Sequence, residues 1–152
     1  MLVVMQELGR ALVVEPYWAT AVGIEALRLG IEKASAFTGD FLARTARSEI
    51  RLAVAFNEPH ACYDLFDLRT SAYANGEHFT LEGTKSMVQH GAQADYWIVP
   101  ARIDGEVALF IVRKEVANVR ITEYRTIDGQ RAATLVSTGR LRCASASARP
   151  AT

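Results

Sequence analysis

None of the potential nucleophiles in this sequence has the neighbours that covalent catalysis requires. Cys62 lies close to His60, but no third polar group is placed to orient the histidine or to activate the thiol. We interpret both as residues of a surface loop without a catalytic role. No serine stands in a G-x-S-x-G turn, in which the hydroxyl would be exposed for attack; the serines are Ser35, Ser48, Ser71, Ser86, Ser137, Ser145 and Ser147.

The histidines and cysteines also lack the spacing of metal ligands. His60, His78 and His90 form no H-x-x-x-H pair, and Cys62 and Cys143 form no C-x-x-C pair. Neither G-x-x-x-x-G-K nor G-x-G-x-x-G occurs. The sequence therefore predicts no metal site and no classical nucleotide-binding loop.

Three charged residues follow or interrupt strand-like runs, and each has a structural interpretation. Glu58 follows an apolar run and precedes Pro59. We interpret it as a solvated turn residue or as a hydrogen-bond partner of nearby backbone groups. Asp95 precedes a strand and is interpreted as a turn cap. Lys85 lies within a strand, and we interpret it as part of a solvated face. No catalytic residue is assigned.

The elements that would position these residues divide the chain into helical and β parts. Residues 1–50 are predicted to be a partial N-terminal helical domain. Pro16 ends its first helix or begins the second, the second ends near Gly30, and a third has a break at Thr38-Gly39 as one alternative. These helices have too few large apolar residues to form a bundle, so we expect them to dock on another layer.

Six or seven short strands are predicted in residues 51–138, and Gly83 is expected to make a bulge or bend. Asn75-Gly76, Asp104-Gly105 and Asp128-Gly129 are typical of tight turns between antiparallel strands. We predict an α+β fold, with a partial N-terminal helical segment followed by an antiparallel β-barrel-like domain. Residues 139–152 are rich in Ala, Ser and Arg and are predicted to be a disordered tail.

The composition excludes several classes of function. Half of the 152 residues are hydrophobic, and 17 acidic residues balance 17 basic ones, so no nucleic-acid partner is predicted. Apolar runs are too short to span a bilayer, and the N-terminus does not resemble a signal peptide. With two cysteines, the chain fits a reducing compartment, and we predict a cytoplasmic location.

A series of short motifs runs along the chain: Glu7-Leu8-Gly9-Arg10-Ala11-Leu12, Glu58-Pro59, the L-x-G-x-K pattern of Leu81, Gly83 and Lys85, Ala94-Asp95 and Ala101-Arg102. With these motifs, the sequence from about Met5 to Val136 resembles the acyl-CoA dehydrogenases, flavoproteins that desaturate acyl-CoA thioesters. The resemblance implies an FAD-dependent oxidoreductase of fatty acid and lipid metabolism.

The resemblance also implies particular site residues. Asn57, Met87 and Gln89 match the positions that contact FAD, and Tyr63 matches a position near the acyl-CoA substrate. The family usually has Thr or Ser, Trp and Thr at the three FAD positions. The amide of Asn57 can still donate a hydrogen bond to the flavin ring. The family's catalytic glutamate lies in a C-terminal helical domain, which we expect to be missing, so none is assigned and the chain alone is expected to be inactive.

Three functions remain open at this point. The chain is a fragment of an acyl-CoA dehydrogenase-like flavoprotein, a non-catalytic partner of a full-length homologous subunit, or a truncated, inactive product. The first implies an acyl-CoA substrate and an acceptor of the electron-transfer flavoprotein type. The altered FAD positions favour the second, and the abrupt helical start and low-complexity tail favour the third.

Overall fold

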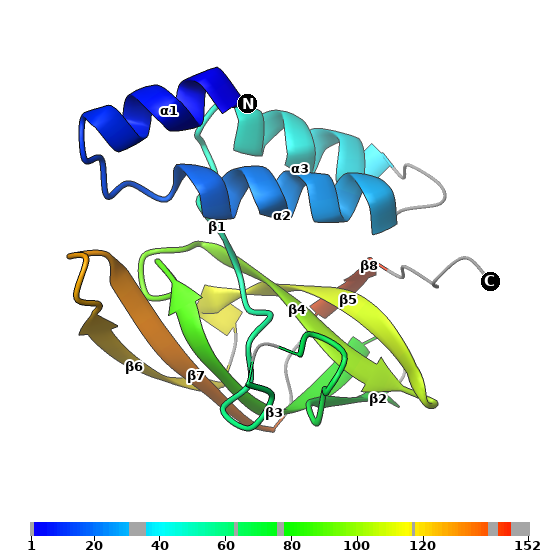
Figure 1. Cartoon of the computed structure of the whole chain (residues 1–152). Helices are drawn as coiled ribbons and strands as arrows, with labels where there is room; N and C mark the ends of the chain where they lie inside the picture. The colour runs from blue at the N-terminus through cyan, green and yellow to red at the C-terminus, as the bar shows by residue number, and fades with distance from the viewer. Residues whose placement is uncertain are drawn as a thin grey trace.

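In the described part of the computed structural model of this chain, three α-helices lie on one side of a strongly curled sheet (Figure 1). The structure describes residues 2–30, 36–62, 64–75, 78–116, 118–139 and 143–146. The helices are α1 (Leu2–Arg10), α2 (Tyr17–Gly30), α3 (Ala36–Ala46) and the 3-10 turn η1 (Lys114–Val116). The strands are β1 (Leu52–Val54), β2 (Ser71–Asn75), β3 (His78–Gln89), β4 (Tyr96–Ile103), β5 (Glu106–Arg113), β6 (Val119–Arg125), β7 (Arg131–Gly139) and β8 (Cys143–Ala146).

The strands form one sheet in the order β6-β7-β3-β2-β4-β5-β8, and β1 pairs with β4 beside that path. Most pairs are antiparallel, whereas β1 and β2 each run parallel to β4. Asp104 and Gly105 both have positive φ, 52° and 86°, as the predicted tight turn between β4 and β5 requires. The predicted α+β class with a barrel-like β-domain is confirmed. The two parallel pairings make the sheet mixed.

Strand β4 is buried on both faces and separates two parts of the core. Trp97 and Val99 point into the curl of the sheet, where they pack with Phe110. Ile98 points the other way and packs against Leu27 and other residues beneath the helices. Because both faces are covered, the strand is continuously apolar from Trp97 to Ala101 instead of alternating between polar and apolar residues.

Helix α2 approaches the sheet closely at a glycine. A Cβ atom on Gly23 would lie 2.7 Å from Leu52 Cδ2, so a larger residue here would push α2 away from β1. Helices α2 and α3 thus cover the sheet. This agrees with the expectation that helices with too few large apolar residues to form their own bundle dock on another layer. Helix α1 has no buried residue. Among the described residues, no helix is both long enough and apolar enough to cross a bilayer.

Two details differ from the sequence expectations. Residues 143–146, predicted to be disordered, form β8 and pair with β5 from Leu109 to Val112. An edge strand pairs through backbone groups, which any extended segment can supply regardless of its side chains; the rest of the predicted tail after Gly139 lies outside the described residues. In β3, the shift in strand register falls between Lys85 and Val88, not at Gly83.

Candidate functional site

A buried ion pair joins the segment after β1 to strand β3. Lys85 Nζ lies 2.7 Å from Glu58 Oε1, and the two side chains are 4% and 2% exposed. Thr70 donates to the same oxygen from its hydroxyl, at 2.6 Å, and from its amide, at 3.2 Å, while the Arg69 amide donates to Oε2 at 2.9 Å. The interpretation of Lys85 as a solvated residue is wrong, because the curl of the sheet encloses that face of β3.

Gly83 makes room for this network. A Cβ atom at Gly83 would lie 2.5 Å from Thr70 Oγ1 and 2.8 Å from Thr70 Cα, and Gly83 has a φ of +153°. Only glycine allows Thr70 to lie so close to β3 while donating to Glu58. The glycine of the L-x-G-x-K pattern therefore allows the backbone of β3 to lie close to the backbone at Thr70.

The pKa directions agree with a structural role for the pair. Burial has the largest effect on the Glu58 carboxyl and raises its pKa, but hydrogen bonds from Lys85, Thr70 and Arg69 together hold the pKa below its usual value. Burial lowers the pKa of Lys85, against the opposing effect of Glu58. Lys85 borders a cavity of only about 20 Å³. The pair holds the domain together and is not placed to meet a substrate.

The three residues matched to FAD positions lie together on the opposite, helix-facing side of the sheet. Asn57, Met87 and Gln89 line one pocket of about 190 Å³, here named the Asn57 pocket. It also includes Trp18 and Ala19 of α2, and its remaining lining residues are Val54, Phe56 and Leu65. The structure thus brings together three side chains from two distant segments, which sequence spacing alone could not show.

A bulge in β3 gives two of these residues their orientation. The register between β3 and β7 shifts between Lys85 and Val88, and Met87 adopts a left-handed conformation with φ of 51°. Val88 is fully buried in the core, whereas Met87 is 46% exposed. In a regular strand, Lys85 and Val88 would point to opposite faces, because they are three positions apart. The extra residue of the bulge allows both to point inward, and Gln89 then points outward.

Two hydrogen bonds hold the bulge. The Ser86 amide donates to the Asn57 carbonyl at 2.9 Å, which fixes β3 against the segment after β1. The Met87 amide donates to the Tyr124 hydroxyl at 3.1 Å, from strand β6. Each bond connects a wall residue of the Asn57 pocket to a different part of the sheet.

Gln89 leaves a polar atom without a partner inside the described structure. Its Oε1 is buried and accepts no hydrogen bond from the described residues. No charged side chain lines the pocket. A buried acceptor normally has a partner, so a ligand with an N–H group would complete the site.

Beside Gln89, the imidazole of His90 is buried under the segment that leads into α2. Burial lowers the pKa of His90, against the effects of Glu15 and the Val14 backbone. His90 Nε2 is buried without a partner among the described residues. His90 is buried beside the Asn57 pocket and does not line it.

Sequence reasoning missed several residues of this region. It did not identify Trp18 or Ala19, although an aromatic residue left partly exposed at the start of a helix is a sign of a binding surface. It also missed Tyr124, which is distant in sequence from β3. Tyr63, predicted to lie near the acyl-CoA substrate, falls outside the described residues.

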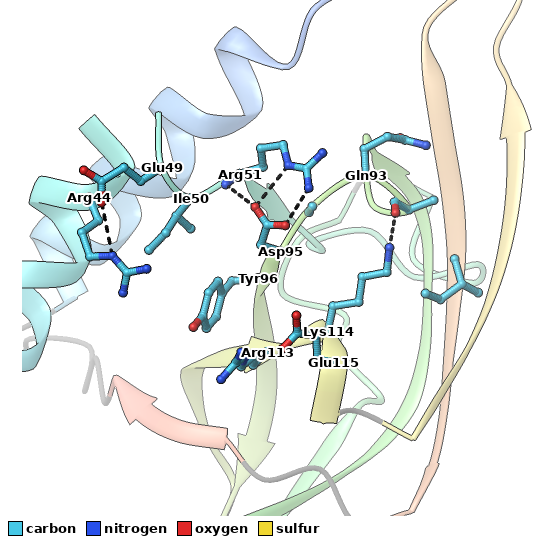
Figure 2. Close-up of a pocket in the computed structure, with 13 residues that line it drawn as sticks. Arg44, Glu49, Ile50, Arg51, Gln93, Asp95, Tyr96, Arg113, Lys114 and Glu115 are labelled. Atoms are coloured by element: carbon cyan, nitrogen blue, oxygen red, sulfur yellow. Dashed lines mark hydrogen bonds and ion pairs between the residues drawn. The ribbon is translucent and has the colours of Figure 1, made fainter. Parts of the chain in front are cut away.

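A larger cleft of about 660 Å³ lies elsewhere, where β1 and β4 begin (Figure 2). Figure 2 shows Asp95 facing Arg51: its carboxylate accepts from the Arg51 amide at 2.8 Å and from the guanidinium at 2.8 and 3.1 Å. Asp95 thus ties together residues far apart in sequence, beyond the turn cap predicted for it. The other cations of the cleft also have partners in the chain: Arg44 with Glu49, Arg113 with Glu115, and Lys114 with the Ala92 carbonyl.

The chain matches known proteins over this same β-domain. A family model described as the acyl-CoA dehydrogenase middle domain matches residues 53–143. A probable acyl-CoA dehydrogenase of Bacillus subtilis (strain 168) is 35% identical over 82 residues, which are 52% of this chain and 14% of that protein.

Solved structures share the fold over a wider range. A chain of the ChsE4–ChsE5 complex from Mycobacterium tuberculosis superimposes with a TM-score of 0.79 at 21% identity, covering 97% of this chain and 39% of that one. A glutaryl-CoA dehydrogenase from Mycobacterium smegmatis in complex with FADH2 gives a TM-score of 0.73 at 22% identity, covering 85% and 34%. This chain therefore spans well under half the length of these relatives. With the family model covering more than half of its residues, the chain belongs to the acyl-CoA dehydrogenase family, and residues 53–143 correspond to the family's middle domain.

Proposed function

We propose that this chain forms the flavin-facing wall of an acyl-CoA dehydrogenase-type oxidoreductase. The observation that carries the proposal is the assembly of Asn57, Met87 and Gln89 in one uncharged pocket. These are the three positions that the family resemblance relates to FAD. They come from two segments, and the folded sheet brings them to the same place.

The chemistry of the pocket fits a flavin ring. Gln89 offers a buried acceptor without a partner, which suits a ring N–H group. Asn57 supplies an amide that both donates and accepts, and Met87 supplies a polarisable side chain suited to the face of an aromatic ring. Trp18 borders the same space from α2.

The size of the pocket fits a wall and not a complete site. At about 190 Å³ it is smaller than the pockets of roughly 300–1,000 Å³ that bury most of a drug-sized ligand. We infer that the domain contacts one side of the ring and leaves the other side to a different part of the enzyme. FAD, when bound, would accept the hydride in the α,β-desaturation of an acyl-CoA thioester.

The residues of this chain would bind and orient the cofactor. Asn57 and Gln89 would fix the ring through hydrogen bonds, and Met87 with Trp18 would exclude water from its face. Among the residues that line the pocket, none is a carboxylate, so we assign no catalytic base in this chain. The proposed reaction also needs a catalytic base, which another surface must provide. It further needs an acyl-CoA substrate and an acceptor of the electron-transfer flavoprotein type, which other surfaces must bind.

FAD binding by the purified chain tests the proposal. We expect the folded chain to bind added FAD at one site, in a titration followed by the visible absorbance of the flavin. Gln89→Leu should weaken binding roughly tenfold, since it removes one hydrogen bond acceptor from a buried site. Gln6→Leu is the matched control, because Gln6 is exposed on α1 and lines no described pocket.

A folded chain that binds no FAD would contradict the proposal. Capture of a full-length acyl-CoA dehydrogenase by such a chain would then favour the alternative of a non-catalytic partner subunit. Equal loss of FAD binding in the Gln89 and Gln6 variants would show that Gln89 has no specific contact with the flavin.

A further inference from the structure

The bulge in β3 is held in an unfavourable conformation at the point where it borders the Asn57 pocket. Met87 has a φ of 51°, in the left-handed region that side chains with a Cβ atom rarely adopt. Such a conformation persists only where the surrounding structure enforces it. Three groups are close enough to do so: the inward anchors Lys85 and Val88 and the hydroxyl of Tyr124.

Tyr124 reaches the bulge across the neighbouring strand. Tyr124 pairs with Ala132 of β7, and Ala132 pairs with Gln89 of β3, so the three residues form one row across the sheet. Residues in such a row point to the same face. The small side chain of Ala132 leaves room on that face for the tyrosine ring to extend toward β3.

The hydroxyl of Tyr124 replaces a missing strand partner. At the register shift, Met87 has no partner on β7, and its amide donates to Tyr124 Oη at 3.1 Å instead. The register resumes at Val88, opposite Ala133, and Gln89 follows opposite Ala132. The hydrogen bond from the Met87 amide therefore fixes the backbone immediately before Met87, the first of the two β3 residues that line the pocket.

We propose that Tyr124 is a positioning residue of the Asn57 pocket: its hydroxyl holds the β3 bulge so that Met87 and Gln89 present their side chains to the flavin. The inference rests on the proposed flavin-binding function. It adds a residue from the edge strand β6 that does not line the pocket and acts through the backbone of Met87.

The variant Tyr124→Phe tests this role, because it keeps the ring and removes the acceptor. Hydrogen exchange of the Met87 amide, followed by NMR, should become faster than in the wild type. FAD binding should weaken about fivefold, the effect of one ordinary hydrogen bond. Tyr73→Phe is the matched control, since Tyr73 is exposed on β2 and should change neither measurement.

A double-mutant cycle separates positioning from general loss of stability. Glycine adopts a positive φ without strain, so Met87→Gly reduces the need for the hydrogen bond. In that background, Tyr124→Phe should change FAD affinity by less than twofold. A loss as large as in the wild-type background would overturn the proposal.

The two proposals fail in distinguishable ways. If Tyr124→Phe leaves both Met87 exchange and FAD affinity unchanged in a chain that binds FAD, the positioning role is overturned and the flavin site stands. If the folded wild-type chain binds no FAD, the flavin site is overturned, and the flavin-positioning role falls with it, whatever happens to the Met87 amide.

Discussion

Among the described residues, two cation–carboxylate pairs join distant parts of the chain, and they differ mainly in burial. Lys85 and Glu58 lie 2.7 Å apart with side chains 4% and 2% exposed, whereas Arg51 and Asp95 lie 2.8 Å apart with side chains 63% and 38% exposed. The distances are almost the same. The comparison shows that the length of an ion pair says little about its importance, which depends on what happens to the remaining charge when one partner is lost.

Loss of Lys85 should have the largest effect on stability. Lys85→Met leaves the Glu58 charge buried with the Thr70 and Arg69 donors and with His60 Nε2 3.8 Å from Oε2, but without its ammonium partner, so we expect the free energy of unfolding to fall by about 3–5 kcal/mol. Urea denaturation followed by circular dichroism measures the change. Glu58→Gln combined with Lys85→Met removes both charges and should recover most of the loss. A fall below about 1 kcal/mol would mean that the buried pair behaves like an exposed one.

Acid should reduce the difference between the wild type and Lys85→Met. In the wild type, burial raises the pKa of Glu58, but hydrogen bonds from Lys85, Thr70 and Arg69 together outweigh this effect and hold the pKa below its ordinary value. The folded state then binds fewer protons than the unfolded state, so this stabilisation is present above about pH 5 and is lost as the pH falls through the folded pKa.

In the Lys85→Met variant, burial still raises the pKa of Glu58, and Lys85 no longer opposes this effect, so the pKa should rise. Protonation of Glu58 then removes the unpaired buried charge and should reduce the destabilisation of the variant. As the pH falls from 7 to below the Glu58 pKa of both proteins, the stability difference should shrink by about 1.4 kcal/mol for each unit that separates the two pKa values. Denaturation curves at several pH values provide the measurement. A difference independent of pH would contradict the assignment to Glu58.

Loss of Asp95 should have the smallest measurable effect. The hydrogen bond from Arg51 lowers the pKa of Asp95, but both partners are solvated and water replaces the bonds that are lost. We expect Asp95→Ala to reduce the free energy of unfolding by at most about 1 kcal/mol, and less at high salt. Arg28→Ala, which breaks a fully solvated pair with Glu25 within α2, should cause no measurable change. A loss for Asp95→Ala equal to that for Lys85→Met would remove the distinction drawn from burial.

Local patterns were sufficient to predict most of the elements. Helical spacing in the first 50 residues and short alternating runs afterwards depend on nearest neighbours in the chain, and Asp104-Gly105 adopts positive φ because of its own residue types. The same reasoning failed for Lys85. A lysine within an alternating strand is typical of a solvated face, and only the curl of the sheet and the carboxylate of Glu58 make the inner face acceptable for it.

The candidate site shows the same division. The family resemblance selected Asn57, Met87 and Gln89, and the structure places all three in one pocket, while their contact with FAD stays a prediction. Trp18 and Tyr124 reach the same region from α2 and β6 and were not identified. Their positions depend on how α2 docks at Gly23 and on the register between β6 and β7, which no local pattern specifies.

The sequence by itself therefore determined the element types, the turns and the family resemblance, because these depend on residue identity and short-range geometry. The tertiary structure decided which face of β3 is interior, that Lys85 is paired with Glu58, and that the bulge at Met87 is held from β6. These features arise from contacts between segments 27 and 37 residues apart, whose energies exist only once the sheet has curled and its strands have paired.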